Sequence, residues 1–572
     1  MKNESTAAIQ DGLGHWEILR RAAGAGGVHQ QNIERSLLTR GFADLGIQLK
    51  PIYIRVPRFV KRTGKTIVSV AAVLAPQDIF HSMHAHHQFG KCFGHPLQWE
   101  KFWHLMREET WFTQHCLAEQ IRSCPAAHCP VLLHQDDAPV SRRVGRNFRA
   151  INMISPFAAG DANLMAVFHL GVAANDDSMS VAVKERQDET IAWGFKQCAE
   201  NRFSTEAPPF VIADRRLKLL QGKTIIPSGE RLTYAGLTGD LNMFALDFEL
   251  PYHHNKFEIS MITKAAKGGM YNFADPRPDA AWASTTRCMT DWFCYLDDNG
   301  IALPKLAEIP GLHVQSFYED QLHVDALGLR QHACGSALRD LAYESAFGSS
   351  MDGAGTWQDK LDLCLHGATR EFRAWQASER VSCTQPAFKS LALSLKRQDD
   401  FPVLKSKGRN CLYVSEWLLH KCDALYRANP TWRAQQRFAL FWGLHGIWDV
   451  AHRVRPRFEL TDSEAAELEQ KRLCGLMGFY SLNLDSSTTT RPGYNIIPKF
   501  NFVDMMARRA VRTKVSHHLF WTFRTEHHMG HIAKIMNKTH GASSKKRVIE
   551  RWLVSFWLWL NEECDDASLV PS

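Results

Sequence analysis

Long hydrophobic runs are absent from this sequence. Its longest apolar stretches, "VSVAAVLA" from Val68 and "WLVSFWLWL" from Trp552, fall far short of the roughly 20 residues that a helix needs to cross a bilayer. The first residues also lack the apolar centre of a secretory signal peptide. We therefore expect no membrane partner and a nuclear or otherwise intracellular location.

Paired cysteine motifs, internal repeats and a strong charge imbalance are missing as well. The 14 cysteines are scattered, so we expect reduced thiols. Lys and Arg number 68 against 60 Asp and Glu, a net charge of +8 that permits a polyanionic partner without requiring one. A hydrophobic content of 45% over 572 residues indicates a globular protein of several domains, or one domain with a large insertion.

The apolar patterns predict how the chain is organised. Helical spacing in "NIERSLLTRGFADLG" and "WEKFWHLMREETWFTQHCLAEQIRS" predicts a mainly helical N-terminal region over 1–122, in which "VSVAAVLA" reads as a buried strand. Three short apolar stretches then predict an antiparallel meander, and "DETIAWGFKQCAENRF" predicts a helix. A further strand and helix follow in "LTYAGLTGDLNMFALDFEL". This β-β-β-α-β order is typical of ribonuclease H-like folds.

The predicted fold class is therefore α+β, with a ribonuclease H-like mixed sheet interrupted by a long α-helical insertion. The first part of the core covers 123–274, and the insertion, rich in Trp and Phe, covers 275–488. A return segment follows over 489–563, and a tail over 564–572.

Acidic residues stand where predicted strands and helices meet. Asp136 ends the first strand of the meander, Asp240 ends the fourth strand, and Glu526 begins a late helix. The first and fourth strands are neighbours in a ribonuclease H-like sheet, so these three acids are candidate catalytic residues and ligands of Mg²⁺ or Mn²⁺. Two such cations support phosphodiester displacement.

Ordinary structural roles compete with this interpretation. Asp240 after a glycine is also a common helix N-cap, and Glu526 would complement a helix dipole. Asp137 is the weaker of two adjacent acids, because neighbouring residues of a strand point to opposite faces.

Five blocks carry a resemblance to known proteins. They are "HQDDAPVSRRVGRNFRAINMISPFA", "YAGLTGDLNMFALDFELP", "LHVDALGLRQHACGSALRDLAYE", "IIPKFNFVDMM" and "FWTFRTEHHMGHIAKI". In this order the chain resembles transposon-derived proteins abundant in dinoflagellate genomes and, more distantly, DDE transposases of the KDZ and hAT groups. The resemblance implies a ribonuclease H-like core with a helical insertion, DNA as partner, and Asp136, Asp240 and Glu526 as the metal-holding acids.

The chain departs from that pattern at three places. Asp137 stands where relatives carry glycine, no cysteine pair occurs between Asp240 and Cys288, and Asn501 stands where a histidine is expected. These departures favour an alternative in which this copy is inactive and only binds nucleic acid. A third alternative is a protein-interaction scaffold built on the Trp-rich insertion.

Basic and histidine-rich stretches are the remaining candidates. Arginines after the first acid, together with a late lysine pair, are predicted to contact DNA phosphates without reading sequence: Arg142, Arg143, Arg146, Lys545 and Lys546. The stretch 81–95, "HSMHAHHQFGKCFGH", matches no standard zinc spacing and is more simply a surface with incidental histidines. His323 and Asp325 are weaker candidates for the site. The sequence leaves a homo-oligomer open.

Overall fold

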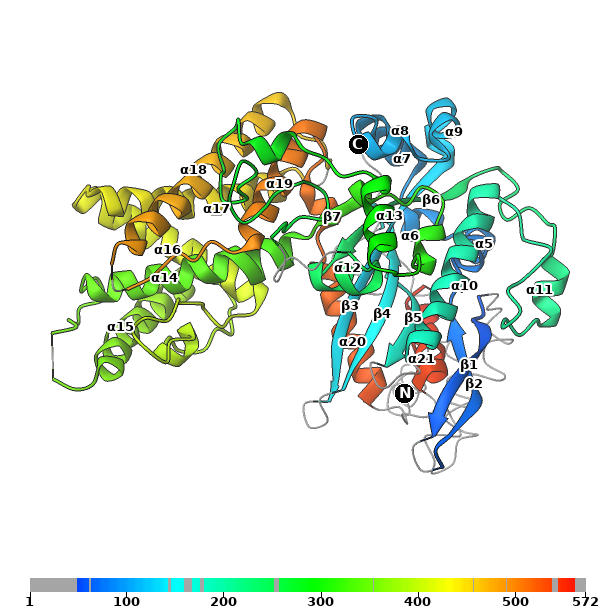
Figure 1. The fold of residues 1–572 in the computed structure, drawn as a ribbon, viewed down its shortest axis with the longest axis horizontal. Helices are drawn as coiled ribbons and strands as arrows, with labels where there is room; N and C mark the ends of the chain where they lie inside the picture. Colours follow the sequence, from blue (N-terminus) through cyan, green and yellow to red (C-terminus); the bar gives the residue numbers. More distant parts are fainter. Residues whose placement is uncertain are drawn as a thin grey trace, which may run out of the picture.

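The computed structural model describes residues 49–60, 63–141, 146–158, 167–174, 180–250, 257–352, 354–455, 457–489, 491–537 and 544–560. The chain is a mixed α/β protein with 55% helix and 13% strand. A sheet covered by helices forms one part of the molecule, and an all-helical lobe extends from it to one side (Figure 1).

A five-stranded mixed sheet is the centre of the first part. Its strands are β3 (His128–Ser141), β4 (Arg146–Ile154), β5 (Phe168–Ala174), β6 (Arg231–Gly239) and β7 (Phe317–Glu319). The order across the sheet is β5-β4-β3-β6-β7. β3, β4 and β5 are antiparallel neighbours, whereas β6 runs parallel to β3 and β7 runs parallel to β6. The predicted meander, and the strand and helix of "LTYAGLTGDLNMFALDFEL", are confirmed as elements.

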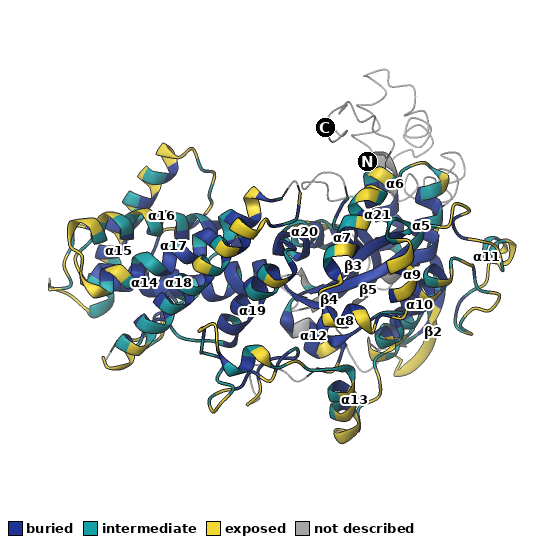
Figure 2. Cartoon of the chain, turned by 90° about the horizontal axis from the view of Figure 1, so that it is seen from above, coloured by how far each residue is buried: buried dark blue, intermediate teal, exposed yellow. Residues whose placement is uncertain are grey.

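Helices cover both faces of this sheet. On one face lie α10 (Ser180–Glu200) and α12 (Leu241–Asp247), and on the other lie α20 (Phe523–Asn537) and α21 (Ser544–Leu560). Asn152 of β4 approaches Met529 of α20, and Phe168 of β5 contacts the ring of Trp552 in α21. Seen from above, the strands are buried between the two helical layers (Figure 2).

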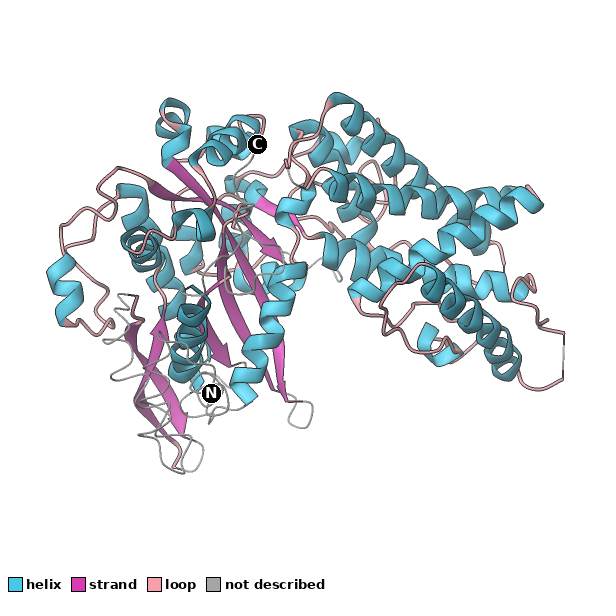
Figure 3. Ribbon diagram, turned by 180° about the vertical axis from the view of Figure 1, so that it is seen from behind, coloured by secondary structure: helices cyan, strands magenta, loops and turns pink. Residues whose placement is uncertain are grey.

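The helical lobe follows β7 in sequence. It contains α14 (Arg330–Tyr343), α15 (Trp357–Ser378), α16 (Gly408–Ala428), α17 (Trp432–Arg453), α18 (Asp462–Ser487) and α19 (Pro498–Thr513). From behind, the lobe lies to one side of the sheet and is drawn without strands (Figure 3), and its last helix, α19, contacts β7 through Arg509. The chain then returns through α20 and α21 to the sheet, so the lobe is inserted between two parts of the sheet domain.

Two expectations about organisation need correction. The region 1–122, predicted as mainly helical, also contains a hairpin of β1 (Ile52–Val60) and β2 (Lys65–Val73). Residues Ile52, Ile54 and Val56 are buried while Arg55 is exposed. This alternation is that of a strand, although the segment is rich in basic residues. The motif "NIERSLLTRGFADLG" and the tail 564–572 lie outside the described residues.

The segment 275–488, predicted as an α-helical insertion, likewise contributes a strand to the sheet. Its β7 pairs with β6 over only three residues, too short for any periodic pattern to reveal it. The lobe itself therefore begins after β7. No helix in the part of the chain that the structure describes is long and apolar enough to cross a membrane.

Buried ion pairs hold β4 against the helices of the α10 face. The guanidinium of Arg149, on β4, donates to Asp188 of α10 at 3.0 Å and to Asp247 of α12 at 2.8 Å. All three side chains are almost fully buried. This buried Arg149, which follows the run of predicted DNA-contacting arginines, therefore serves packing and faces away from solvent.

Replacing Arg149 with alanine should lower the free energy of unfolding by about 3 kcal/mol, because two buried carboxylates lose their buried partner and keep only the partly exposed Lys184. Urea denaturation followed by circular dichroism measures this. The control is Arg427→Ala, which removes an exposed pair with Asp423 and should cost at most about 1 kcal/mol. Equal losses in the two variants would contradict the structural role of Arg149.

Candidate metal centre

Three aspartates stand at the same level of three neighbouring parallel strands. Gln135 of β3 pairs with Gly239 of β6, and Gly239 pairs with Glu319 of β7. The residues that come next are Asp136, Asp240 and Asp320. Asp240 and Asp320 directly follow their strands, but the prediction that Asp136 ends its strand is wrong, because β3 continues to Ser141 in its pairing with β4. Parallel pairing therefore aligns three carboxylates in a row across the sheet.

The glycine before Asp240 is a condition for this alignment. Gly239 has φ +148°, and a Cβ at that position would collide with the backbone oxygen of Gln135. Any other residue would force β3 and β6 apart where the acids need to be close. Gly239 is therefore required by the close approach of β3 and β6, in addition to its place before the helix that starts after Asp240.

Helix α20 adds a fourth carboxylate from a distant part of the chain. One ring nitrogen of His134, one oxygen of Asp136 and one oxygen of Glu526 all lie within 4.8 Å of one another. Within the described ranges, this is the one group of three or more such side chains with metal-binding spacing. Asp136 is 8% exposed, whereas the Glu526 side chain is 33% exposed, so the group opens to solvent on the α20 side.

The charges of this group are unfavourable without a cation. Burial, followed by the nearby charge of Glu526, raises the pKa of Asp136 well above its usual range. A divalent cation would relieve both effects, because it compensates the two carboxylates at once. The donor set, two carboxylates and an imidazole, therefore fits a metal ion.

A buried aspartate–histidine pair stands beside the carboxylates. Asp320 accepts hydrogen bonds from Nδ1 of His323 at 2.5 Å and from the hydroxyl of Thr522 at 2.6 Å. Its oxygens also accept from the backbone N–H groups of Leu322, His323 and Thr522. Burial alone would raise the pKa of Asp320, but these hydrogen bonds hold it below its usual range. Asp320 is therefore a fixed carboxylate that orients the His323 ring.

His323 directs its other nitrogen at the acidic group. Its Nε2 lies 3.5 Å from Oε1 of Glu526. Burial lowers the pKa of His323, but the bond to Asp320 and the charges of Asp320, Asp240 and Glu526 outweigh it and raise the value to about 9. His323 is thus an imidazolium at neutral pH.

A partly buried lysine, Lys499, approaches from α19. Burial lowers the pKa of Lys499, while the charges of Asp240 and Asp320 act in the opposite direction. Gly328 makes room for it, because a Cβ there would lie 2.6 Å from Cδ of Lys499. This lysine comes from the "PKFNF" block, so that block supplies a cation to the site.

The predicted acids have different outcomes. Asp136 and Glu526 are brought together. Asp240 is outside that three-residue group but lies at the adjacent strand end and acts electrostatically on His323 and Lys499. Asp137 lies outside the three-residue group as well; its backbone N–H donates to Oδ1 of Asp136 at 2.7 Å.

The predicted phosphate-contacting residues are mostly beyond the described atoms. Arg142 and Arg143 lie outside the described residues, as do the side chains of Arg146 and Lys545. Lys546 is described: it pairs with Glu550 at 3.7 Å and stands over a tyrosine ring of β1. It therefore lies on α21 beside the hairpin, where it contacts other parts of this chain.

Apart from His323, the weaker candidates contact other parts of the protein or have no hydrogen-bond partner among the described residues. Asp325 forms a buried pair with Arg330 at 2.6 Å. In the stretch 81–95, His81 bonds the backbone oxygen of Ile225 and His95 caps the helix α7 (Pro96–Met106), and the described residues there form no metal-binding group. Asn501 is fully buried with no hydrogen-bond partner for its amide.

Sequence reasoning missed His134, Asp320 and Lys499. His134 precedes Asp136 by two residues, so strand alternation alone would have placed both on one face. Asp320 follows "SFYE", the same strand-then-acid pattern as Asp136, but with a strand of three residues. Lys499 carried no signal, since its approach depends on how α19 packs.

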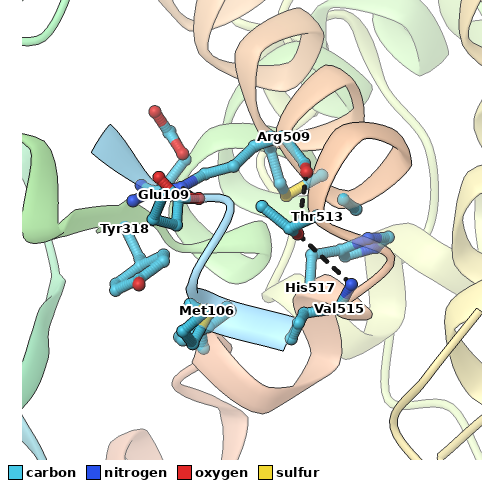
Figure 4. A pocket seen from close by; sticks show the side chains of 11 residues that line it. Met106, Glu109, Tyr318, Arg509, Thr513, Val515 and His517 are labelled. Atoms are coloured by element: carbon cyan, nitrogen blue, oxygen red, sulfur yellow. Dashed lines mark hydrogen bonds and ion pairs between the residues drawn. The ribbon is translucent and has the colours of Figure 1, made fainter. Parts of the chain in front are cut away.

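A small buried cavity lies behind the strand that precedes Asp320. It has a volume of about 10 Å³, room for one water molecule, and is lined by Met106, Glu109, Tyr318, Glu319, Met506, Arg509, Ala510, Thr513, Val515, His517 and Phe520. Figure 4 shows Arg509 reaching toward Glu109 and Tyr318 at its rim. The cavity is too small for a substrate.

No protein-family model matches the sequence, and no curated protein is significantly similar to it. The site is therefore interpreted from its own geometry and chemistry.

Glu319 should make the stability of the protein depend on pH. Burial, only partly offset by Arg509, raises its pKa to about 7, with Glu109 and Arg512 as the other charges facing it. The unfolded chain loses this proton near pH 4.5, so the folded state loses stability as the pH rises from there to about 7. Urea denaturation at pH 5 and pH 8 should show a loss on the order of 3 kcal/mol that Glu319→Gln removes. Equal pH dependence in both proteins would refute this.

Proposed function

We propose that this protein is a DDE-type transposase-like enzyme that cleaves phosphodiester bonds of DNA and transfers the strands with divalent cations. One observation carries the proposal. Asp136 and Glu526 come from distant segments of the chain and lie within 4.8 Å of each other and of a ring nitrogen of His134, and Asp240 follows the adjacent strand β6 at the same level.

The topology of the sheet supports a ribonuclease H-like core. Three antiparallel strands are followed by α10; β6 then lies beside the first of them, β7 lies beside β6, and both run parallel to the first strand. The helical lobe between β7 and α20 is consistent with the helical insertion of KDZ-like and hAT-like transposases. The order of these elements supports the resemblance without depending on the identity of any one residue.

The carboxylates have distinct positions for holding cations. Asp136, on β3, stands between Glu526 from α20 and the strand end that carries Asp240, so it is the acid best placed to be shared. When bound, two divalent cations activate the attacking oxygen and stabilise the leaving oxygen of a phosphodiester. The partly exposed Glu526 leaves access for a substrate from solvent.

Two cationic side chains of this chain would face the phosphate. His323 holds its proton at Nε2, beside Glu526, and would donate a hydrogen bond to a phosphate oxygen. Lys499 adds positive charge near Asp240. Asp320 acts through His323 as a positioning residue, because it fixes the ring through Nδ1.

DNA is the proposed partner, in keeping with the net charge of +8. A DNA substrate favours a nuclear location. The cations proposed are Mg²⁺ or Mn²⁺, as the carboxylates require oxygen-preferring ions.

A nicking assay tests the proposal. Supercoiled plasmid and short duplexes would be incubated with full-length protein and Mg²⁺ or Mn²⁺. Asp136→Asn, Asp240→Asn and Glu526→Gln should each lower the rate at least about 100-fold, because losing even an outer-sphere metal partner costs up to that factor. Their unfolding curves should remain close to that of the parent protein.

A matched control is Asp399→Asn in a loop of the helical lobe, where the side chain is exposed. It should nick DNA at the parent rate. Equal activity in the parent and the three site variants would eliminate the catalytic proposal. Salt-dependent DNA binding without nicking in any protein would instead support the non-catalytic alternative that the three departures favour.

A further inference from the structure

The histidine that precedes Asp136 has no explanation in the proposed chemistry. The side chain of His134 is fully buried, and its Nε2 has no hydrogen-bond partner among the described residues. A buried polar atom left without a partner costs about 1–3 kcal/mol and calls for a reason. A bound ion is one such reason, since a lone pair of imidazole is a metal donor.

The position of the ring is that of a ligand. His134 and Asp136 are two residues apart on β3, so both face α20. A ring nitrogen of His134 lies within 4.8 Å of oxygens of both Asp136 and Glu526. Two ligand atoms on one ion lie roughly 3–4.4 Å apart when each bond is about 2.0–2.2 Å long. The spacing of this group is therefore close to that of ligands around one cation.

The other ring nitrogen of His134 is already held. Its Nδ1 lies 3.2 Å from the side-chain nitrogen of Asn152. The side-chain oxygen of Asn152 lies 3.0 Å from Nδ1 of His169. Register places these three residues side by side on β3, β4 and β5. Histidine ligands characteristically have their second nitrogen fixed by such a partner.

This row also permits the tautomer that a metal needs. In the structure the side-chain nitrogen of Asn152 faces His134 and its oxygen faces His169. A ligating Nε2 requires the proton on Nδ1, so metal binding requires the amide of Asn152 to be turned over, with its oxygen toward His134 and its nitrogen toward His169. The amide can take this orientation because His169 accepts or donates at Nδ1 according to its own tautomer. The buried row thus supports His134 as a neutral ligand.

We propose that His134 is a third protein ligand beside Asp136 and Glu526, which makes this position selective for imidazole-binding divalent cations such as Mn²⁺ or Zn²⁺ over Mg²⁺. The inference rests on the proposed function in that Asp136 and Glu526 must hold a cation. The selectivity follows from chemistry: Mg²⁺ takes oxygen ligands and retains water, whereas imidazole nitrogen suits transition-series ions.

Mn²⁺ binding to the full-length protein tests this without any activity assay. Electron paramagnetic resonance measures free and bound Mn²⁺, and competition by Mg²⁺ measures its affinity. His134→Gln should weaken Mn²⁺ binding about 10- to 100-fold and change Mg²⁺ binding less than about threefold. His128→Gln is the matched control, since it removes a buried histidine of the same strand that bonds Thr233 and lies outside both the metal group and this row, and it should leave Mn²⁺ affinity within about threefold.

Spectroscopy keeps the test decisive if His134→Gln does not fold. Electron spin echo modulation of bound Mn²⁺ should show coupling to an imidazole nitrogen, and this coupling should persist in His323→Gln. Absence of the coupling, its loss in His323→Gln, or unchanged Mn²⁺ affinity in a folded His134→Gln would overturn the inference.

The outcomes separate this inference from the proposed function. If Asp136→Asn abolishes Mn²⁺ binding but His134→Gln does not, the acids hold a cation and only the role of His134 fails. If the parent protein binds neither Mn²⁺ nor Mg²⁺, both proposals fail together.

Discussion

Parallel pairing of β3 with β6 and of β6 with β7 is the constraint on which the site depends. It aligns Asp136, Asp240 and Asp320 at one level, although they are scattered along the chain. Gly239 permits the close approach of β3 and β6 at that level. Helix α20 then needs only to cross β3 for Glu526 to reach the same place.

Assembling carboxylates in a buried place is unfavourable, and the surroundings show how the cost is offset. His323 is held as a cation by Asp320, and Lys499 enters from the helical lobe. The helical lobe therefore contributes to the site, because α19 belongs to the lobe and the turn at Gly328 adjoins it. A metal ion would add the remaining positive charge.

The two faces of the sheet have different roles. On the α10 face, Arg149 pairs with Asp188 and Asp247, which stabilises the sheet. On the α20 face, His134 retains a nitrogen that has no hydrogen-bond partner among the residues that the structure describes. Alternation along β3 and β4 separates these roles, since adjacent residues point to opposite sides.

The sequence by itself determined the elements that local patterns encode. Period-2 and period-3.6 apolar spacing predicted the meander, α10, and the strand and helix around Asp240, and the strand-then-acid pattern selected Asp136 and Asp240. It predicted a strand at "VSVAAVLA", where β2 lies, but missed its partner β1, where basic charge masked the alternation of Ile52, Ile54 and Val56.

Only the tertiary structure decided which side chains meet. The three-residue strand β7 has too few residues for a period, so Asp320 was not recognised as the third aspartate of the row. The approach of Glu526, Lys499 and His323 depends on helices that cross the sheet from distant segments. Such contacts follow from strand register and helix packing, which are properties of the whole fold and leave no periodic trace in the local sequence.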